Sequence, residues 1–93
     1  MHVHSITIEL ALPTDSLKGK RGIVKSILAR ARHRFNVGAA EVDLQDVRDT
    51  AVIAFVTVTG SRAAGPDILR QLEDWLAEER PDVEIMAAEI EER

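Results

Sequence analysis

The segment TAVIAFVTVT, residues 50–59, decides how this chain folds. Apolar and β-branched side chains occupy both of its alternating faces, and a strand of that kind is typically covered on both sides. A polar turn at residues 45–49 precedes the segment, and Gly60-Ser61 ends it. The segment therefore predicts a central strand at about residues 50–60.

Three further segments are predicted to form strands around this one. Residues 3–12 carry a large aliphatic side chain at every second position, from Ile6 to Leu12. Residues 39–45 alternate apolar side chains with Glu41 and Asp43, and this period of two is typical of a half-buried strand. Together with VEIMAAEI at the end of the chain, these patterns predict strands at about 2–13, 37–46 and 82–91.

Two segments have the helical period instead. Between residues 17 and 35 the apolar residues fall on one stripe at helical spacing, Ser16 is a good N-cap, and Gly38 follows the end. A second apolar stripe, from Ile68 to Leu76, follows Pro66, which is tolerated in a first helical turn. The helices are predicted at about 17–35 and 66–79.

The resulting order is strand-helix-strand-strand-helix-strand. Two right-handed crossovers joined by a hairpin give a four-stranded antiparallel sheet with both helices on one face. This is the α+β, ferredoxin-like sandwich, with strand order 4-1-3-2 and the strand at 50–60 inside the sheet. The 93 residues are expected to form a single domain of this kind, residues 1–93.

The composition excludes several classes of protein. Apolar residues make up 45% of the chain and charged residues 30%, as in ordinary globular domains. There is no cysteine, so thiolate metal sites and disulfides are excluded. The N-terminal segment lacks the features of a secretory signal, and no apolar run approaches the ~20 residues that span a bilayer. We expect a cytoplasmic protein that does not enter membranes.

Charge is distributed unevenly along the chain. Residues 1–40 have a net charge of +5 and residues 41–93 a net charge of −9. Seven of the twelve Lys and Arg residues lie between Lys18 and Arg34, with no acidic residue among them. On a helical wheel four of them fall within about 60° of one another and form what we call the basic ridge: Lys18, Arg21, Lys25 and Arg32. Such a ridge suits a phosphate backbone or an acidic partner, and it is equally the pattern of a solvated helix face.

No catalytic set is apparent. There is no glycine-rich phosphate loop and no nucleophile–base pair. The adjacent carboxylates Glu73-Asp74 and Glu78-Glu79 lie on the second predicted helix, where they are expected to be solvated. His2 and His4 share one side of the first strand, but two histidines alone make a poor metal site, and a frayed polar strand end is the favoured interpretation. We predict no catalytic residues, no metal and no cofactor.

The central strands bear on two further hypotheses. A sheet that binds RNA through stacked bases needs aromatic residues there, and only Phe55 is present. If Val52, Ala54, Val56 and Val58 face the helices, Ile53 and Phe55 point outward, and a second copy of the chain is the simplest cover for them. The sequence thus predicts a dimer face at Ile53 and Phe55.

The segment Leu17-Lys18-Gly19-Lys20-Arg21 resembles the SLKxKR signature of the YlxP-like family, small bacterial proteins of unknown function. The resemblance extends to RFNV at 34–37 with AEV at 40–42, to Gln45-Asp46, and to RPDV at 80–83. The sequence departs from the family pattern at Gly19 and Gly22, and at Gly65-Pro66. The resemblance implies a ferredoxin-like fold and a gene placed among translation-initiation and ribosome-maturation factors; it brings no catalytic residues.

Three functional hypotheses follow. The first is a non-enzymatic accessory protein that binds RNA or a ribosomal particle through the basic ridge. The second is a homodimeric protein-interaction or ligand-sensing regulatory module. The third is an enzyme whose site forms only between subunits.

Overall fold

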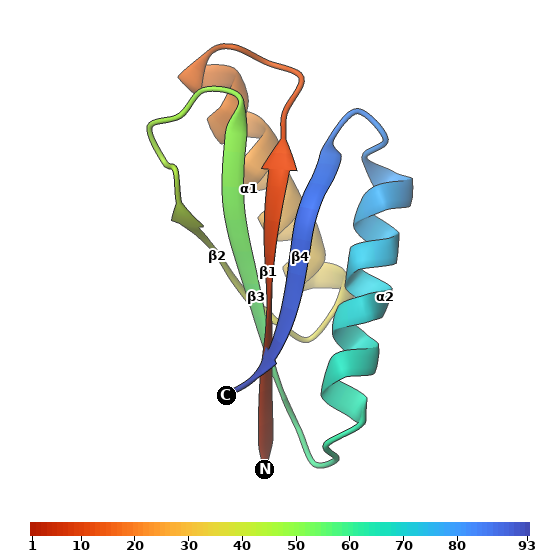
Figure 1. The fold of residues 1–93 in the computed structure, drawn as a ribbon. Coiled ribbons are helices and arrows are strands. Elements are labelled where there is room, and N and C mark those ends of the chain that lie inside the picture. The colour runs from red at the N-terminus through yellow and green to blue at the C-terminus, as the bar shows by residue number, and fades with distance from the viewer.

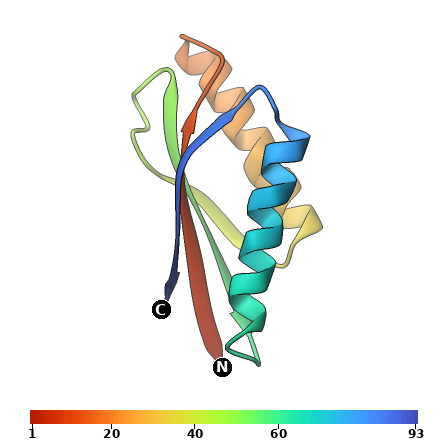
Figure 2. The same ribbon diagram turned by 45° about the vertical axis from the view of Figure 1, so that its right-hand side comes forward.

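The computed structural model describes residues 1–93, and its sheet has the strand order β2-β3-β1-β4 with every neighbouring pair antiparallel. Both helices lie on one side of this sheet (Figures 1 and 2). The predicted α+β, ferredoxin-like fold and its strand order are therefore confirmed. The elements along the chain are β1 (His2–Ala11), α1 (Leu17–Arg34), β2 (Gly38–Asp43), β3 (Thr50–Thr59), α2 (Ala64–Glu79) and β4 (Glu84–Glu92).

The largest difference from the predicted boundaries is at β2, which ends at Asp43 rather than near residue 46. The pairing of β2 with β3 is irregular between Glu41 and Asp43, and Leu44 has a φ of 58°. A left-handed residue cannot continue a strand, so the chain leaves the sheet here. At α2 the helix begins at Ala64, two residues before the predicted start, so that Pro66 lies within the first turn.

The core fills the space between the sheet and the two helices. The side chains that β1 sends to this side are Ile6, Ile8 and Leu10, each fully buried. In β3 their direct partners are Phe55, Ile53 and Ala51. Directly opposite residues of an antiparallel pair share one face of the sheet, so these β3 residues also point toward the helices.

The predicted outward orientation of Ile53 and Phe55 is therefore wrong. Ile53 is 0% exposed and Phe55 is 1% exposed, and both belong to the core. The alternate residues of β3 face away from the helices, where Val56 is 40% and Val58 is 54% exposed. The larger side chains point to the helix side because they fill the volume between the layers, and the valines are left on the other face.

The expectation of a frayed end at the start of β1 is also wrong for His4. The imidazole of His4 is 3% exposed, and its Nδ1 atom is buried without a hydrogen-bond partner. It packs against the first turn of α2, where a Cβ added to Gly65 would lie 2.4 Å from Nδ1. Gly65 therefore lets α2 approach the sheet closely at this end.

Replacing Gly65 by Ala should destabilise the protein by about 1–3 kcal/mol, because the new methyl group overlaps a buried ring that cannot swing into solvent. For a domain of this size the melting temperature falls by about 4–8 °C per kcal/mol. Thermal unfolding followed by circular dichroism measures the change. The double variant Gly65→Ala/His4→Ala has no overlap. The free energy of unfolding that it loses should therefore be smaller than the sum of the losses in the two single variants.

Gly22→Ala is the matched control. Gly22 is exposed in the interior of α1, and a Cβ added there meets nothing within 4 Å. This variant should gain about 0.5–1 kcal/mol from helix propensity alone. Equal melting temperatures for Gly65→Ala and the wild type would contradict the close approach of α2 to His4.

Candidate nucleic-acid interface

Three cations of the basic ridge are free of partners. Lys18, Arg21 and Lys25 are exposed, and none of them makes an ion pair or a side-chain hydrogen bond. The fourth, Arg32, is also exposed, but its Nη2 donates a hydrogen bond to the carbonyl of Ala39 in β2. The structure thus brings the four predicted residues to the flank of α1 that faces β2, and leaves three of them available to a ligand.

Lys20, in the same run of cations, points the other way. Its side chain is 1% exposed. The ammonium donates to three backbone carbonyls of the β2–β3 connection: that of Leu44, that of Val47 at 2.6 Å and that of Thr50 at 2.7 Å. These bonds use all three protons of the ammonium.

Glu41 supplies the counter-charge for Lys20. Its Oε2 lies 3.1 Å from the Lys20 Nζ, yet this oxygen accepts no hydrogen bond. The two observations agree, because the three ammonium protons are already directed at carbonyl oxygens. The carboxylate therefore acts through charge, and it offsets the cost of burying a cation in the protein interior.

The Lys20 ammonium also explains the backbone of the β2–β3 connection. Leu44 is the one non-glycine residue with a positive φ, and such a conformation costs of order 1 kcal/mol or more. It persists because the Leu44 carbonyl is bound by Lys20 and its N–H donates to Asp43 Oδ1 at 2.8 Å. The connection is thereby fixed against the first turns of α1, beside the basic ridge.

The outermost strip of α1 carries small side chains. By helical spacing Gly22, Ser26 and Ala29 lie next to the basic ridge on the side away from the sheet. Gly22 and Ala29 are exposed, Ser26 is partly exposed, and open space surrounds Gly22. A phosphate backbone could therefore approach the helix axis closely beside three free cations.

Carboxylates also lie on the opposite side of the sheet, which we call the open sheet face. Glu9 of β1 points to this side, as do Thr7 and Ser5 of the same strand. Their partners in β4 are Glu89 and Glu91, which therefore point to this side as well. No helix covers this face (Figure 2). The cations of α1 and the carboxylates of Glu9 and Glu89 therefore lie on opposite sides of the sheet, Glu91 is paired with Arg93, and the remaining acidic residues include those of α2.

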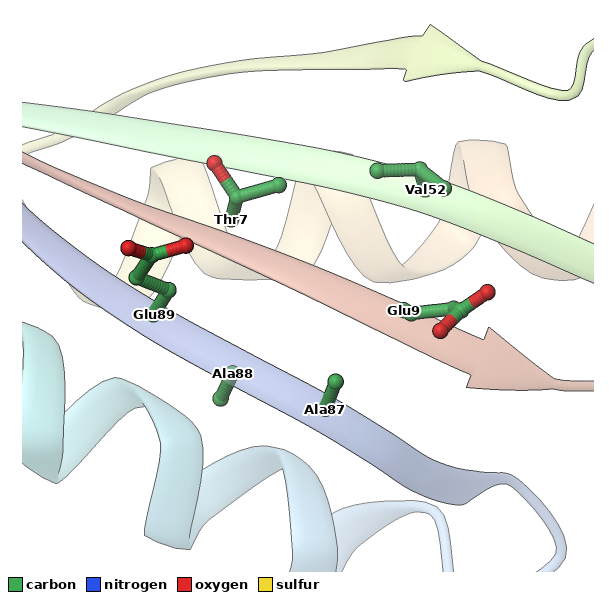
Figure 3. Close-up of a pocket in the computed structure, with 6 residues that line it drawn as sticks. All are labelled: Thr7, Glu9, Val52, Ala87, Ala88 and Glu89. Carbon is green, nitrogen blue, oxygen red and sulfur yellow. The ribbon is translucent and has the colours of Figure 1, made fainter.

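A shallow hollow on the open sheet face is lined by Thr7, Glu9, Val52, Ala87, Ala88 and Glu89. Figure 3 shows that the Glu9 carboxylate points along β1 away from Glu89, whereas the Glu89 carboxylate rises from β4 toward β1. Hydrolysis by a pair of carboxylates needs the two groups to converge on one bond. The hollow does not have that geometry.

The two pKa values that depart clearly from their ordinary range belong to one ion pair. Arg80 donates from Nε and Nη2 to the two Asp82 oxygens, at 2.9 and 2.7 Å. This hydrogen bonding lowers the pKa of the Asp82 carboxyl and raises that of the Arg80 guanidinium. Neither residue lines a cavity, so the pair fixes the turn between α2 and β4 rather than serving acid–base chemistry.

Residues 3–90 match the family described as "Protein of unknown function (DUF503)". The chain belongs to the DUF503 family. It is also similar to a YlxP protein of Bacillus subtilis (strain 168) described as uncharacterized, with 38% identity over 47 residues. That match covers 50% of this chain and 51% of the relative, so it spans about half the length of each. The predicted resemblance to the YlxP-like family is confirmed, and the descriptions of the family and of this relative assign no function.

No helix of this DUF503 protein is both long and apolar enough to cross a membrane.

Two features of the site were not predicted from the sequence. Lys20 could have been found, because it falls within the apolar stripe of α1 on a helical wheel. The surroundings of Trp75 depend on how α1 and α2 pack together, and no local pattern signals them.

Lys20→Met should destabilise the protein by about 3–5 kcal/mol, because three carbonyls and the Glu41 carboxylate lose their partner in a mostly buried site. Urea unfolding followed by fluorescence measures the loss. The double variant Lys20→Met/Glu41→Gln should recover part of the stability, since it removes the charge left unpaired.

Lys18→Met is the matched control, because Lys18 is an exposed lysine of the same helix with no partner. Its stability should stay within about 0.5 kcal/mol of the wild type. If Lys20→Met and Lys18→Met unfold at the same urea concentration, the structural role of Lys20 is wrong.

Proposed function

We propose that this DUF503 protein is a non-enzymatic accessory protein that binds RNA, alone or within a ribosomal particle, through the basic ridge of α1. One observation carries the proposal: Lys18, Arg21 and Lys25 are exposed side by side on one helix, and no carboxylate of the chain neutralises them. Several other cations of the chain are paired with acids, as in Arg62–Glu92 and Arg70–Asp67. Unpaired cations beside small side chains are what a phosphate backbone requires.

The position of the carboxylates supports an oriented complex. Repulsion from Glu9 and Glu89 would turn the open sheet face away from a polyanion, while the ridge would face it. The cytoplasm, expected from the sequence, is where such RNA would be met. The gene neighbourhood implied by the family resemblance points to the same class of partner.

Charge reversal of Lys18 and Lys25 together should weaken RNA binding by at least about tenfold at moderate salt and leave the fold intact. For the wild type, contacts to three or four phosphates give a log–log salt slope between about −2 and −3 on single strands. The slope should become shallower by at least about 1 in the double reversal. Fluorescence anisotropy of a labelled RNA at several salt concentrations measures both quantities.

Arg62→Glu/Arg70→Glu is the matched control. It makes the same change in net charge, at two exposed arginines outside α1. Its affinity should fall far less than that of the ridge variant. Binding that does not depend on salt, or equal losses in the two variants, would show that the ridge is not the binding surface.

A second candidate function, self-association as an interaction module, is favoured by the open sheet face. Val56 and Val58 are 40% and 54% exposed on β3, the strand on which the sequence predicted a dimer face. We propose a second copy as the occupant of this face, because apolar side chains on a sheet gain by mutual burial. The nearby carboxylates oppose close approach of two copies, so this association is expected to be weak.

Sedimentation over a range of concentrations tests the dimer. Val56→Glu should shift it to folded monomers, and higher salt should strengthen it by screening the carboxylates. Phe55→Glu is not a test, because it introduces a charge into the core and unfolds the chain. A wild type that sediments as a monomer at every concentration would reject the second candidate.

A further inference from the structure

A pocket of about 200 Å³ lies between the last turns of α1 and α2, and we call it the Trp75 pocket. It is lined by Arg30, His33 and Arg34 from α1 and by Trp75 and Glu79 from α2. Arg30 and Glu79 form an ion pair between the two helices and so fix one wall. The pocket is smaller than the 300–1,000 Å³ typical of drug-sized ligands, which suits a single planar ring system.

Trp75 is held in a fixed orientation. Its ring packs edge-on against Phe35, with centroids 5.7 Å apart and an interplanar angle of 72°. Arg34 stacks over the Phe35 ring, 5.8 Å from its centroid, and has no acidic partner. Trp75 remains partly exposed. An aromatic ring supported in this way, beside a guanidinium with no acidic partner, forms a stacking surface that loses little conformational freedom on binding.

The Trp75 pocket is continuous with the proposed RNA surface. Arg30, His33 and the small side chains of Gly22, Ser26 and Ala29 follow one another around the exposed side of α1. The basic ridge is on one flank of the helix, and the Trp75 pocket is on the other. A strand whose phosphates lie on the ridge could cross the small side chains and reach Trp75.

We infer that the Trp75 pocket binds one unpaired base of a single-stranded RNA, stacked on Trp75 and flanked by the Arg34 guanidinium. This inference rests on the proposed function and names its ligand class. Arg30 neutralises Glu79, whereas Asp74 and Glu78 around the adjoining hollow are in no ion pair and repel phosphate, so the base enters and not the backbone. A base inside a duplex is stacked and paired, and it cannot insert.

The aromatic residues of the chain support this location. The chain has two Phe, one Trp and no Tyr. Phe55 is buried in the core, so no aromatic ring is available on the open sheet face for stacking. Trp75, supported by Phe35, is the ring that an RNA base can reach, and base–aromatic stacking is a large part of single-strand affinity.

The fluorescence of Trp75, the only tryptophan, reports directly on this pocket. An unstructured RNA dodecamer should quench Trp75 as it binds, with a midpoint equal to the dissociation constant from anisotropy. The blunt duplex of the same strand, at the same phosphate concentration, should leave Trp75 fluorescence nearly unchanged.

Two pairs of variants test the role of the side chains. Trp75→Leu should weaken binding of the labelled dodecamer about tenfold without changing the salt slope, because stacking involves no counterion release. Trp75→Phe, the matched control, should stay within about threefold of the wild type. Arg34→Gln, an exposed substitution that does not touch the core, should weaken binding several-fold, and its quenching should fall with it. Circular dichroism confirms that each variant is folded.

The outcomes separate the two proposals. If binding depends on the ridge while Trp75 is not quenched and Trp75→Leu binds like the wild type, the Trp75 pocket is wrong and the RNA function stands. If Trp75 is quenched and reversal of Lys18 and Lys25 has no effect, the pocket stands and the ridge is wrong. If neither single strand nor duplex binds at low salt, both proposals are overturned.

Discussion

The structure depends on one interaction, the binding of the buried Lys20 ammonium to the β2–β3 connection. It joins the first turns of α1 to the β2–β3 connection through three backbone carbonyls and the charge of Glu41. A cation inside a protein is tolerated only when its partners are complete, and here every proton of the ammonium has an acceptor. The side chain thus fixes both the path of a polar loop and the rotation of a helix about its axis.

The rotation of α1 determines what the molecule presents to its surroundings. With Lys20 directed inward, Lys18, Arg21 and Lys25 are directed outward, and Arg30 and Arg34 are directed toward α2. The cations therefore lie on both flanks of a strip of small side chains, on the side of the sheet away from Glu9 and Glu89. The proposed RNA surface and the Trp75 pocket are two parts of this single arrangement.

The sequence predicted the fold because its patterns were unambiguous where the fold is decided. Two helical stripes, two alternating strands and a strand apolar on both sides admit few topologies. The same two-sided apolarity made the orientation of Ile53 and Phe55 unpredictable. Alternation tells which residues face the core only when the other set of positions is polar, and here both sets are apolar. Only the register with Ile6 and Ile8 settles which side chains enter the core. The Trp75 pocket was also beyond the sequence, because it depends on the packing of two helices.

RNA is proposed to contact the outer side of α1 and not the sheet. Amide chemical shifts of the ¹⁵N-labelled protein, recorded while a single-stranded RNA dodecamer is added, test it most directly. Shifts should change at Gly22, Ser26 and Ala29 and at the indole N–H of Trp75, with Val52 to Val58 of β3 unaffected. Changes confined to β3 and β4, with α1 unmoved, would contradict it.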